Sequence, residues 1–278
     1  MKVREIEVAV ISDIHLATHA CNPRMVLKYL KSVQPKILVL NGDIIDSWRF
    51  SRNYFPKPQL KVIRQFIKMM EKGVQIYYIT GNHDEFLRKF NQTEIGKLKI
   101  VNQLILDLDG LKTWIFHGDI FDNTIHKTKW LAKLGAGAYG LLTLFNKIVN
   151  RILKWSGNSE VIIYKSITNY LTKENLNLSK FETAIGNAAI SQGYQTVICG
   201  HTHIPKEKVI TIQEVTVKYL NCGDWVEHFT ATEYFDGCWH LHYHDELDDE
   251  TQTDDIDVPE KQQLYQLLVK ELVFANTL

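Results

Sequence analysis

Short runs of apolar, β-branched residues recur along the chain, each bounded by Gly, Asn, Asp or Ser. Continuous apolar runs of about four to eight residues are typical of strands that are buried on both faces. We therefore predict strands over Glu7–Ser12, Lys36–Leu40, Gln75–Thr80, Thr113–Phe116 and Gln195–Cys199. After Cys199, further strands are predicted over Lys208–Ile212, Thr216–Leu220, Thr230–Tyr234 and Cys238–His242.

Between the early strands the hydrophobic pattern changes to a helical period. Met25–Ser32 follows Asn22-Pro23, a pair that is typical of a helix cap and first turn. A second helix is predicted over Gln59–Lys72, because it ends at Gly73 and has a regular apolar face. The predicted buried residues of that face are Leu60, Ile63, Phe66, Ile67 and Met70. Alternating strands and helices favour an α/β layered domain over residues 1–244.

Two segments depart from this alternation. Residues 124–180 have a helical pattern and lie between two predicted strands, so we expect an inserted helical cap or lid. Asp245–Glu260 contains nine acids and no base, which predicts a solvated acidic linker. Residues 261–278 have apolar positions at helical spacing, which predicts a short amphipathic C-terminal helix.

The composition restricts the class of protein. Apolar residues make up 45% of the chain and charged residues 23%, the mixture of an ordinary globular protein. Glu5 and Glu7 interrupt the place of a signal-peptide core, and the four cysteines show no CxxC spacing. We therefore expect a cytoplasmic protein with reduced thiols. The formal net charge of zero argues against a strongly basic protein of the kind that binds nucleic acids, so no nucleic-acid partner is expected.

Polar motifs follow five of the predicted strands. They read SDIHL, NGDIID, GNHD, HGD and GHTH, beginning at residues 12, 41, 81, 117 and 200. In open α/β sheets, ligands bind at the carboxyl ends of the strands. We therefore expect seven side chains to meet at one rim: Asp13, His15, Asp43, Asn82, His117, His201 and His203.

These seven side chains offer oxygen and nitrogen donors and no thiolate. Such a donor set suits Mn²⁺, Fe²⁺ or Zn²⁺. Seven ligands exceed what one ion needs, so we predict two ions that share one carboxylate. A single Asp or His at a strand end is more often a turn residue than a ligand. Five such motifs in order favour a dinuclear metal centre, in which two ions about 3.5–4 Å apart activate water.

The ordered motifs D-x-H, GD, GNHD, H and GHTH resemble the calcineurin-like metallophosphoesterase superfamily over about residues 1–235. The resemblance implies an α/β fold, a four-layer αββα sandwich of two mixed β-sheets flanked by helices. It also implies that Asp43 bridges two divalent ions, with Mn²⁺ our first expectation. One ion would be held by Asp13, His15 and His203, and the other by Asn82, His117 and His201. His83 would then be the catalytic group for the leaving oxygen, and we expect Asp84 to orient it.

SDIHL, the GDIIDSW of Gly42–Trp48 and the long insert are similar to one branch of this superfamily, the bacterial UDP-2,3-diacylglucosamine diphosphatases. That resemblance implies cleavage of a pyrophosphate to UMP and lipid X, in lipid A biosynthesis. His83 stands where the best-known enzymes of that branch have Arg. It favours the alternative of a phosphomonoesterase or phosphodiesterase acting on another phosphorylated metabolite or lipid. A non-catalytic scaffold is a minor alternative, and the oligomeric state is left open.

The insert carries nine bases and two acids, so its net charge of +7 accounts for most of the net charge of +8 of the first 244 residues. Its apolar face either packs on the body as a cap, or lines an acyl-chain pocket as a lid. In the lid interpretation the bases meet phosphates and the inner-membrane surface, and the association is peripheral. The corresponding substrate contacts are Asn158, Ser159, Lys165, Lys147 and Arg151.

Overall fold

The computed structural model describes residues 3–48, 55–121 and 174–245, and the side chains of the last range from residue 180 onward. The chain divides into two compact units. One unit comprises residues 1–122 and 180–252, and the other comprises residues 123–179 and 253–278. The described residues therefore belong to the first unit, apart from residues 174–179 at the start of the helix that leads into it.

One sheet of this unit has seven strands in the order β12-β11-β1-β2-β3-β5-β4. The four central strands are parallel to one another, and antiparallel pairs join the outer strands to them. The central strands are β1 (Arg4–Ile11), β2 (Val33–Asn41), β3 (Gln75–Ile79) and β5 (Leu98–Val101). The outer strands are β4 (Glu94–Ile95), β11 (Thr230–Phe235) and β12 (Cys238–Tyr243).

The other sheet has five strands in the order β6-β7-β8-β10-β9. Its three middle strands are parallel and its two edge strands are antiparallel to their neighbours. The middle strands are β7 (Leu111–Ile115), β8 (Thr196–Cys199) and β10 (Val215–Asn221). The edge strands are β6 (Leu104–Leu108) and β9 (Lys206–Ile212).

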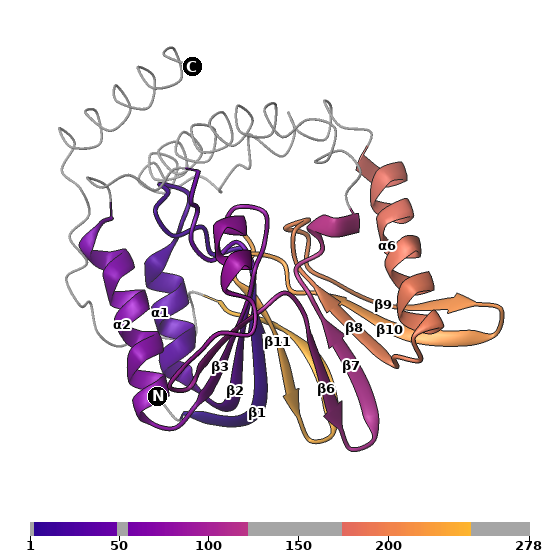
Figure 1. Ribbon diagram of the computed structural model, residues 1–278, viewed down its shortest axis with the longest axis horizontal. Helices are drawn as coiled ribbons and strands as arrows, with labels where there is room; N and C mark the ends of the chain where they lie inside the picture. The colour runs from indigo at the N-terminus through magenta and orange to yellow at the C-terminus, as the bar shows by residue number, and fades with distance from the viewer. Residues whose placement is uncertain (1–2, 49–54, 122–173, 246–278) are drawn as a thin grey trace, which may run out of the picture. The chain divides into compact units, whose positions relative to one another are not determined.

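Helices cover the outer faces of both sheets (Figure 1). The helices α1 (Pro23–Ser32) and α2 (Lys57–Glu71) lie on the seven-stranded sheet, and α6 (Glu174–Ser191) lies on the five-stranded sheet. Two short 3₁₀ helices, η1 (Glu85–Phe90) and η2 (Asp119–Phe121), follow β3 and β7. The order of layers is helix, sheet, sheet, helix, so the predicted four-layer sandwich of two mixed sheets is confirmed.

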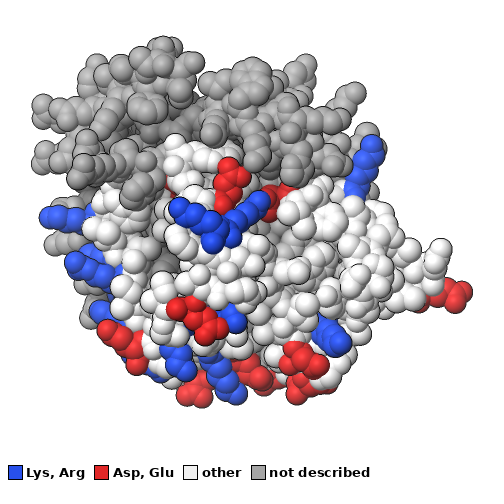
Figure 2. Space-filling model, in the orientation of Figure 1, with Lys and Arg blue, Asp and Glu red and all other residues white. Residues whose placement is uncertain are grey.

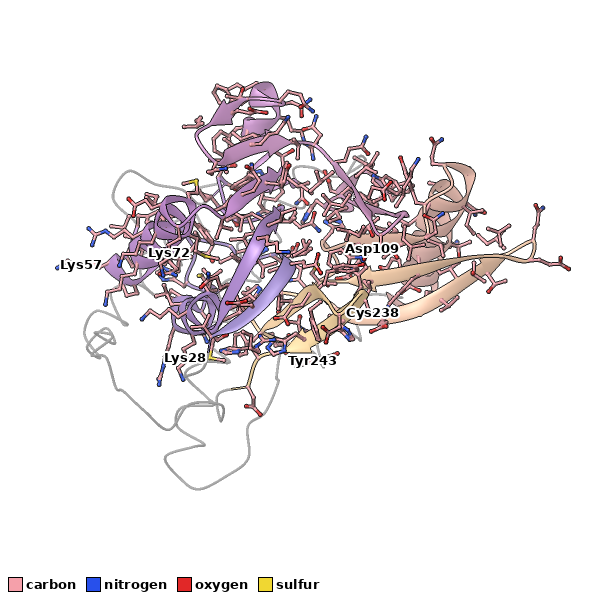
Figure 3. The ribbon with its side chains drawn as sticks, turned by 90° about the horizontal axis from the view of Figure 1, so that it is seen from below. Lys28, Lys57, Lys72, Asp109, Cys238 and Tyr243 are labelled. Carbon is pink, nitrogen blue, oxygen red and sulfur yellow. The ribbon has the colours of Figure 1, made fainter. Side chains whose placement is uncertain are left out.

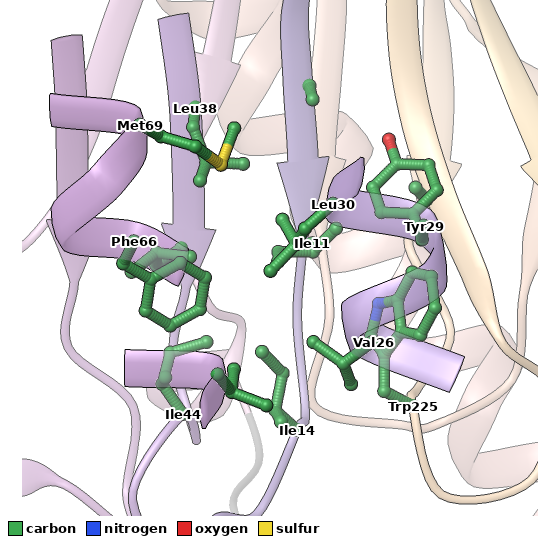
Figure 4. Close-up of a cluster of buried hydrophobic side chains, with 14 of the residues drawn as sticks. Ile11, Ile14, Val26, Tyr29, Leu30, Leu38, Ile44, Phe66, Met69 and Trp225 are labelled. Atoms are coloured by element: carbon green, nitrogen blue, oxygen red, sulfur yellow. The ribbon is translucent and has the colours of Figure 1, made fainter. Parts of the chain in front are cut away.

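The alternation of side chains along the central strands produces three separate cores. In β1, Ala9 and Ile11 face α1 and α2, where they meet Leu30 and Phe66 (Figure 4). The alternate residues of β1 pack between the two sheets. The same rule places one set of β7, β8 and β10 side chains between the sheets and the other set against α6. Strands that are buried on both faces therefore need continuous apolar runs, as the sequence shows.

The nine predicted strands are all present, with ends that differ by a few residues. The sequence pattern did not reveal β4, β5 and β6, because they are short and carry charged residues at alternate positions. Helix α6 crosses the end predicted for the insert at residue 180. The rest of the insert, the acidic linker after Asp245 and the C-terminal helix lie outside the described residues. Among the described helices, none is long and apolar enough to cross a membrane.

The buried face predicted for α2 is confirmed at Phe66, Ile63 and Met70, which lie in or against the core, and is wrong at its other two positions. Leu60 is 42% exposed and Ile67 is 45% exposed, whereas the neighbouring Gln59 is buried. The side chain of Gln59 accepts a hydrogen bond from the Ala17 amide and donates one to the Thr18 carbonyl, both at 2.7 Å. These two bonds hold a polar residue inside and turn the helix by about one position. Apolar periodicity alone cannot foresee a buried glutamine.

Candidate metal centre

The five polar motifs meet at the carboxyl ends of β1, β2, β3, β7 and β8. Backbone hydrogen bonds tie their loops together. The Asp13 amide donates to the Gly42 carbonyl at 3.1 Å, and the His15 amide donates to the Asp43 carbonyl at 2.9 Å. The Gly200 amide donates to the His117 carbonyl at 2.8 Å, which joins the motifs of the second sheet. The rim predicted from the strand ends is therefore one structural unit.

Backbone strain is concentrated in these loops. Five of the seven predicted ligands have φ between 53° and 68°, in the left-handed region that non-glycine residues rarely adopt. They are Asp13, His15, Asp43, His201 and His203. Such conformations cost about 1–3 kcal/mol each and persist only where the surrounding structure holds them in place. The fold therefore holds these side chains in fixed orientations at a cost in stability.

The first group of side chains consists of Asp13, His15 and His203. His15 Nε2 and His203 Nε2 lie 3.3 Å apart, with their rings stacked at 5.1 Å between centroids. Asp13 Oδ1 lies 3.3 Å from His203 Nε2 and 3.9 Å from His15 Nε2. The other oxygen of Asp13 accepts hydrogen bonds from Ser12 Oγ and the His201 amide. One carboxylate oxygen and two imidazole nitrogens therefore face the same point.

The second group consists of Asp43, His117 and His201. His117 Nε2 lies 3.3 Å from Asp43 Oδ2, while its Nδ1 donates to the Asn41 carbonyl at 2.9 Å. That bond fixes the ring orientation and leaves Nε2 as the free nitrogen. Asn82 joins the group through its side-chain oxygen, which lies 3.1 Å from His201 Nδ1. All seven predicted ligands are thus brought together, in two groups.

Among the described residues, seven buried side-chain atoms have no hydrogen-bond partner, and two of them belong to the predicted ligands: Asp13 Oδ1 and His117 Nε2. Buried polar groups without a partner cost about 1–3 kcal/mol each, so native structures rarely keep them. Both atoms belong to the two groups above, and both are electron-pair donors. This donor set of carboxylate, imidazole and amide oxygen suits a divalent cation and lacks the thiolates of a structural zinc site.

The charges at the rim reinforce one another. Burial raises the pKa of the Asp43 carboxyl, but His117 and His83 outweigh burial and hold the pKa well below its ordinary value. Burial lowers the pKa of His203, but Asp13 and Asp224 outweigh burial and raise the pKa to about 9. The rim therefore holds ionised carboxylates next to imidazoles, at a site whose carboxylates are buried and whose outer histidines are partly exposed.

His83 lies beside the two groups and is held from several sides. Its Nδ1 donates to Asp46 Oδ2 at 2.9 Å, its amide donates to Asp43 Oδ1 at 2.8 Å, and its ring packs on Trp48 at 4.0 Å between centroids. Its Nε2 lies 4.0 Å from Asp43 Oδ2. Burial lowers the pKa of His83, but the carboxylates of Asp43 and Asp46 raise it above its ordinary value overall.

The expectation that Asp84 orients His83 is wrong in its geometry, because Asp46 makes that contact. Asp84 is fully buried and accepts hydrogen bonds from the Gly81 amide, the Ile44 amide and the Tyr78 hydroxyl. It therefore joins the loops after β2 and β3. Adjacent residues in this tight turn point in different directions, so sequence adjacency to His83 was misleading.

Asp224 is a functional candidate that the sequence analysis missed. It is fully buried, and its Oδ2 accepts a hydrogen bond from His203 Nδ1 at 2.9 Å. Its Oδ1 accepts bonds from the amides of Glu227 and His228 and from His228 Nδ1. A signal was present, since Asn221–Asp224 reads NCGD after a strand, much like the NGD of residues 41–43.

Two glycines are required by close approach at this rim. A Cβ at Gly81 would overlap the carboxylate and the amide of Asp43. A Cβ at Gly200 would overlap the side chains of Ser12 and Asp13. The G of GNHD and of GHTH therefore allows two backbones to approach ligand carboxylates that any larger residue would displace.

The predicted substrate contacts fall outside the described residues. They are Asn158, Ser159, Lys165, Lys147 and Arg151. The interpretation of the insert as a lid therefore stays a prediction.

The fold and the site define a phosphoester-cleaving enzyme that depends on metal ions. The sequence profile of the calcineurin-like phosphoesterase family matches residues 6–205, and the chain belongs to this family. The chain is therefore a metal-dependent phosphoester hydrolase, as the motifs predicted.

Curated relatives cover most of the chain. The UDP-2,3-diacylglucosamine hydrolase of Aliivibrio fischeri (strain MJ11) is 29% identical over 248 residues, which are 84% of this chain and 96% of that protein. The protein of the same name from Yersinia pestis bv. Antiqua (strain Angola) is 24% identical over 229 residues, 77% of this chain and 89% of its own length. A solved archaeal phosphodiesterase covers 85% of this chain and 98% of its own, with 16% identity and a TM-score of 0.39.

Proposed function

We propose that the protein is a dinuclear metal-dependent hydrolase that cleaves the pyrophosphate of UDP-2,3-diacylglucosamine to UMP and lipid X, a step of lipid A biosynthesis. The single observation that carries the dinuclear centre is that Asp43 belongs to two donor groups, one with His117 and His201 and one with His15 and His83, while His15 also belongs to the group of Asp13 and His203. Two relatives named for this substrate match nearly their whole length, which supports the substrate.

Asp13, His15 and His203 would hold one ion, and Asn82, His117 and His201 would hold the other. Asp43 would bridge them. The fit is supported by the unpartnered Asp13 Oδ1 and His117 Nε2 and by the facing nitrogens of His15 and His203. Two imidazole nitrogens at 3.3 Å are close enough to ligate one cation, which would replace the proton that they share in an N–H···N hydrogen bond. We propose Mn²⁺, with Fe²⁺ and Zn²⁺ as alternatives, because all three accept imidazole and carboxylate ligands.

When bound, the two ions would polarise the phosphoryl oxygens and supply an activated water for in-line displacement. The chain's own contribution is the placement of His83. Asp46 accepts a hydrogen bond from Nδ1 of His83, so Nε2 is the atom that faces the rim beside Asp43. From there it can donate a hydrogen bond to the leaving oxygen or protonate it. His83 is therefore the proposed catalytic group, and Asp46 the residue that positions it.

The second candidate is a phosphomonoesterase or phosphodiesterase that acts on another phosphorylated metabolite or lipid. The observation in its favour is His83 itself, where the best-known diphosphatases have Arg. An imidazole at Nε2 presents one donor, whereas a guanidinium presents a fork that can hold two phosphate oxygens at once. A site with one donor suits a substrate with a single phosphoryl group near the metals.

An assay with three substrates distinguishes these functions: UDP-2,3-diacylglucosamine, bis-p-nitrophenyl phosphate and p-nitrophenyl phosphate. The proposal predicts that UMP and lipid X form far faster than nitrophenol, and that Asp43→Ala abolishes turnover. Release of nitrophenol without any UMP would favour the second candidate. Turnover that Asp43→Ala leaves unchanged would contradict both candidates, and no turnover of any of the three substrates would favour the non-catalytic scaffold. We further propose that the protein is cytoplasmic and meets its substrate at the membrane surface.

A further inference from the structure

The outer face of α2 combines unpaired bases with exposed aliphatic side chains. Its exposed bases are Lys57, Lys61, Arg64, Lys68 and Lys72, and Glu71 is the one acid of the helix. Leu60 and Ile67, which are 42% and 45% exposed, lie one heptad apart on the same face. The residues that an amphipathic helix normally buries are here presented to solvent, next to positive charge.

The arrangement around the helix axis is ordered. At about 100° per residue, the five bases fall within about 80° of the circumference, directly beside the line through Leu60 and Ile67. Val62, Phe66 and Met69 occupy the opposite side and pack on the sheet. The exposed half of α2 therefore has an aliphatic edge and a basic edge in parallel, over the helix's 15 residues.

The neighbouring helix extends the basic surface. Arg24, Lys28 and Lys31 of α1 and Lys36 of β2 add four bases at least partly exposed. In Figure 3, Lys28, Lys57 and Lys72 lie on the side of the unit that α1 and α2 form, and Figure 2 shows successive blue side chains over α2. Among the described residues, none of these nine bases forms an ion pair. By contrast, six bases elsewhere do: Arg4, Arg88, Lys99, Lys206, Lys208 and Lys218.

This surface begins next to the metal centre. Gln59, in the first turn of α2, holds the backbone of Ala17 and Thr18, and these two residues closely follow His15. A partner that lies along the basic face of α2 would therefore have one end close to the loop that carries His15. The face is fixed to the site by buried hydrogen bonds rather than by an exposed loop.

We propose that the exposed face of α1 and α2 docks on an anionic lipid bilayer, with Leu60 and Ile67 in the interface and the bases on the lipid headgroups. The inference rests on the proposed function in one respect, that the substrate is a membrane-borne lipid. Aliphatic side chains beside a basic stripe are typical of helices that lie on membrane surfaces. A nucleic acid would satisfy the bases and leave Leu60 and Ile67 without a partner. Among the described residues of α1 and α2, no aromatic side chain on which bases could stack is exposed.

Co-sedimentation of the full-length protein with vesicles tests this directly. The probes are vesicles of phosphatidylglycerol with phosphatidylethanolamine, and vesicles of phosphatidylcholine alone. We expect binding to the anionic vesicles only, and weaker binding as salt screens the charges. The triple variant K61Q/R64Q/K68Q should lower the partition coefficient at least tenfold, since each base contributes about fivefold near an anionic surface. L60Q/I67Q should lower it without changing the salt dependence.

The matched control is K89Q/K97Q/K112Q, which removes three exposed bases from other elements. It should bind the vesicles within about twofold of wild type, because its bases lie away from the docking face. All variants should hydrolyse a soluble phosphodiester at the wild-type rate, so a failure of docking is separable from a failure of the proposed function.

Two outcomes overturn the proposal. One is equal loss of binding in the two triple variants, which would mean that only net charge matters. The other is no binding of wild type to anionic vesicles at low salt.

Discussion

Replacement of Asp224 by Asn should weaken one metal site and spare the other. Asp224 Oδ2 accepts a hydrogen bond from His203 Nδ1 at 2.9 Å, which leaves Nε2 to face Asp13 and His15. Asp224 Oδ1 serves a different task, since it accepts the amide protons of Glu227 and His228. An Asn side chain has one oxygen and one amide donor, so it can satisfy only one of these two sides.

The expected size follows from the loss of that contact. Removing the partner of a ligand histidine typically lowers metal affinity about 10–100-fold, which equals about 1.4–2.7 kcal/mol. Isothermal titration of the metal-free protein with Mn²⁺ should therefore show one site at wild-type affinity and one weakened by that factor. Circular dichroism checks that the variant remains folded.

His228→Ala is the matched control for Asp224. His228 Nδ1 donates to Asp224 Oδ1 at 3.2 Å, and His228 makes no contact with the predicted ligands among the described residues. Its loss should leave both Mn²⁺ affinities within about threefold, a change of less than 1 kcal/mol. Wild-type affinity at both sites in a folded Asp224→Asn protein would refute the argument that Asp224 orients His203.

Three further predictions follow from the same contacts. Gln59→Leu should lower the free energy of unfolding, measured by urea titration, by about 2 kcal/mol, because it leaves the buried Ala17 amide and Thr18 carbonyl without a hydrogen-bond partner. Leu60→Gln, at an exposed position, should change the free energy of unfolding by less than about 0.5 kcal/mol. A larger loss in Leu60→Gln than in Gln59→Leu would contradict the observed orientation of α2. Gly200→Ala should lower the free energy of unfolding by about 1–3 kcal/mol, because its Cβ overlaps the side chains of Ser12 and Asp13, and it should also lower the affinity for Mn²⁺. A variant with an unchanged melting temperature and unchanged metal affinity would show that the backbone at Gly200 does not need to lie this close to Asp13. His83→Ala should reduce turnover about 10²–10⁴-fold with unchanged metal content, and loss of bound metal in that variant would instead make His83 a ligand.

The parts of the fold that the sequence predicted are those that local pattern determines. A strand buried on both faces needs a continuous apolar run, and in four of the five motifs that follow these strands Gly stands beside Asp, Asn or His. These signals lie within about six residues of one another, so β1, β2, β3, β7 and β8 and the seven side chains at their ends could be predicted.

Features that depend on contacts between distant segments could not be predicted in the same way. The orientation of α2 depends on Gln59 meeting a loop about forty residues earlier, which is invisible in the helical period. The partner of His83 is Asp46, on a different loop, rather than the adjacent Asp84. Asp224 reaches His203 because β8 and β10 are paired side by side, and strand order is not encoded in any one motif.

The central claim is that two metal ions share Asp43, and anomalous diffraction from crystals grown with Mn²⁺ tests it most directly. The account predicts two manganese peaks about 3.5–4 Å apart, one on each side of the Asp43 carboxylate. One peak should lie among Asp13, His15 and His203, and the other between His117 and His201. A single peak, or two peaks of which neither contacts Asp43, would contradict the account.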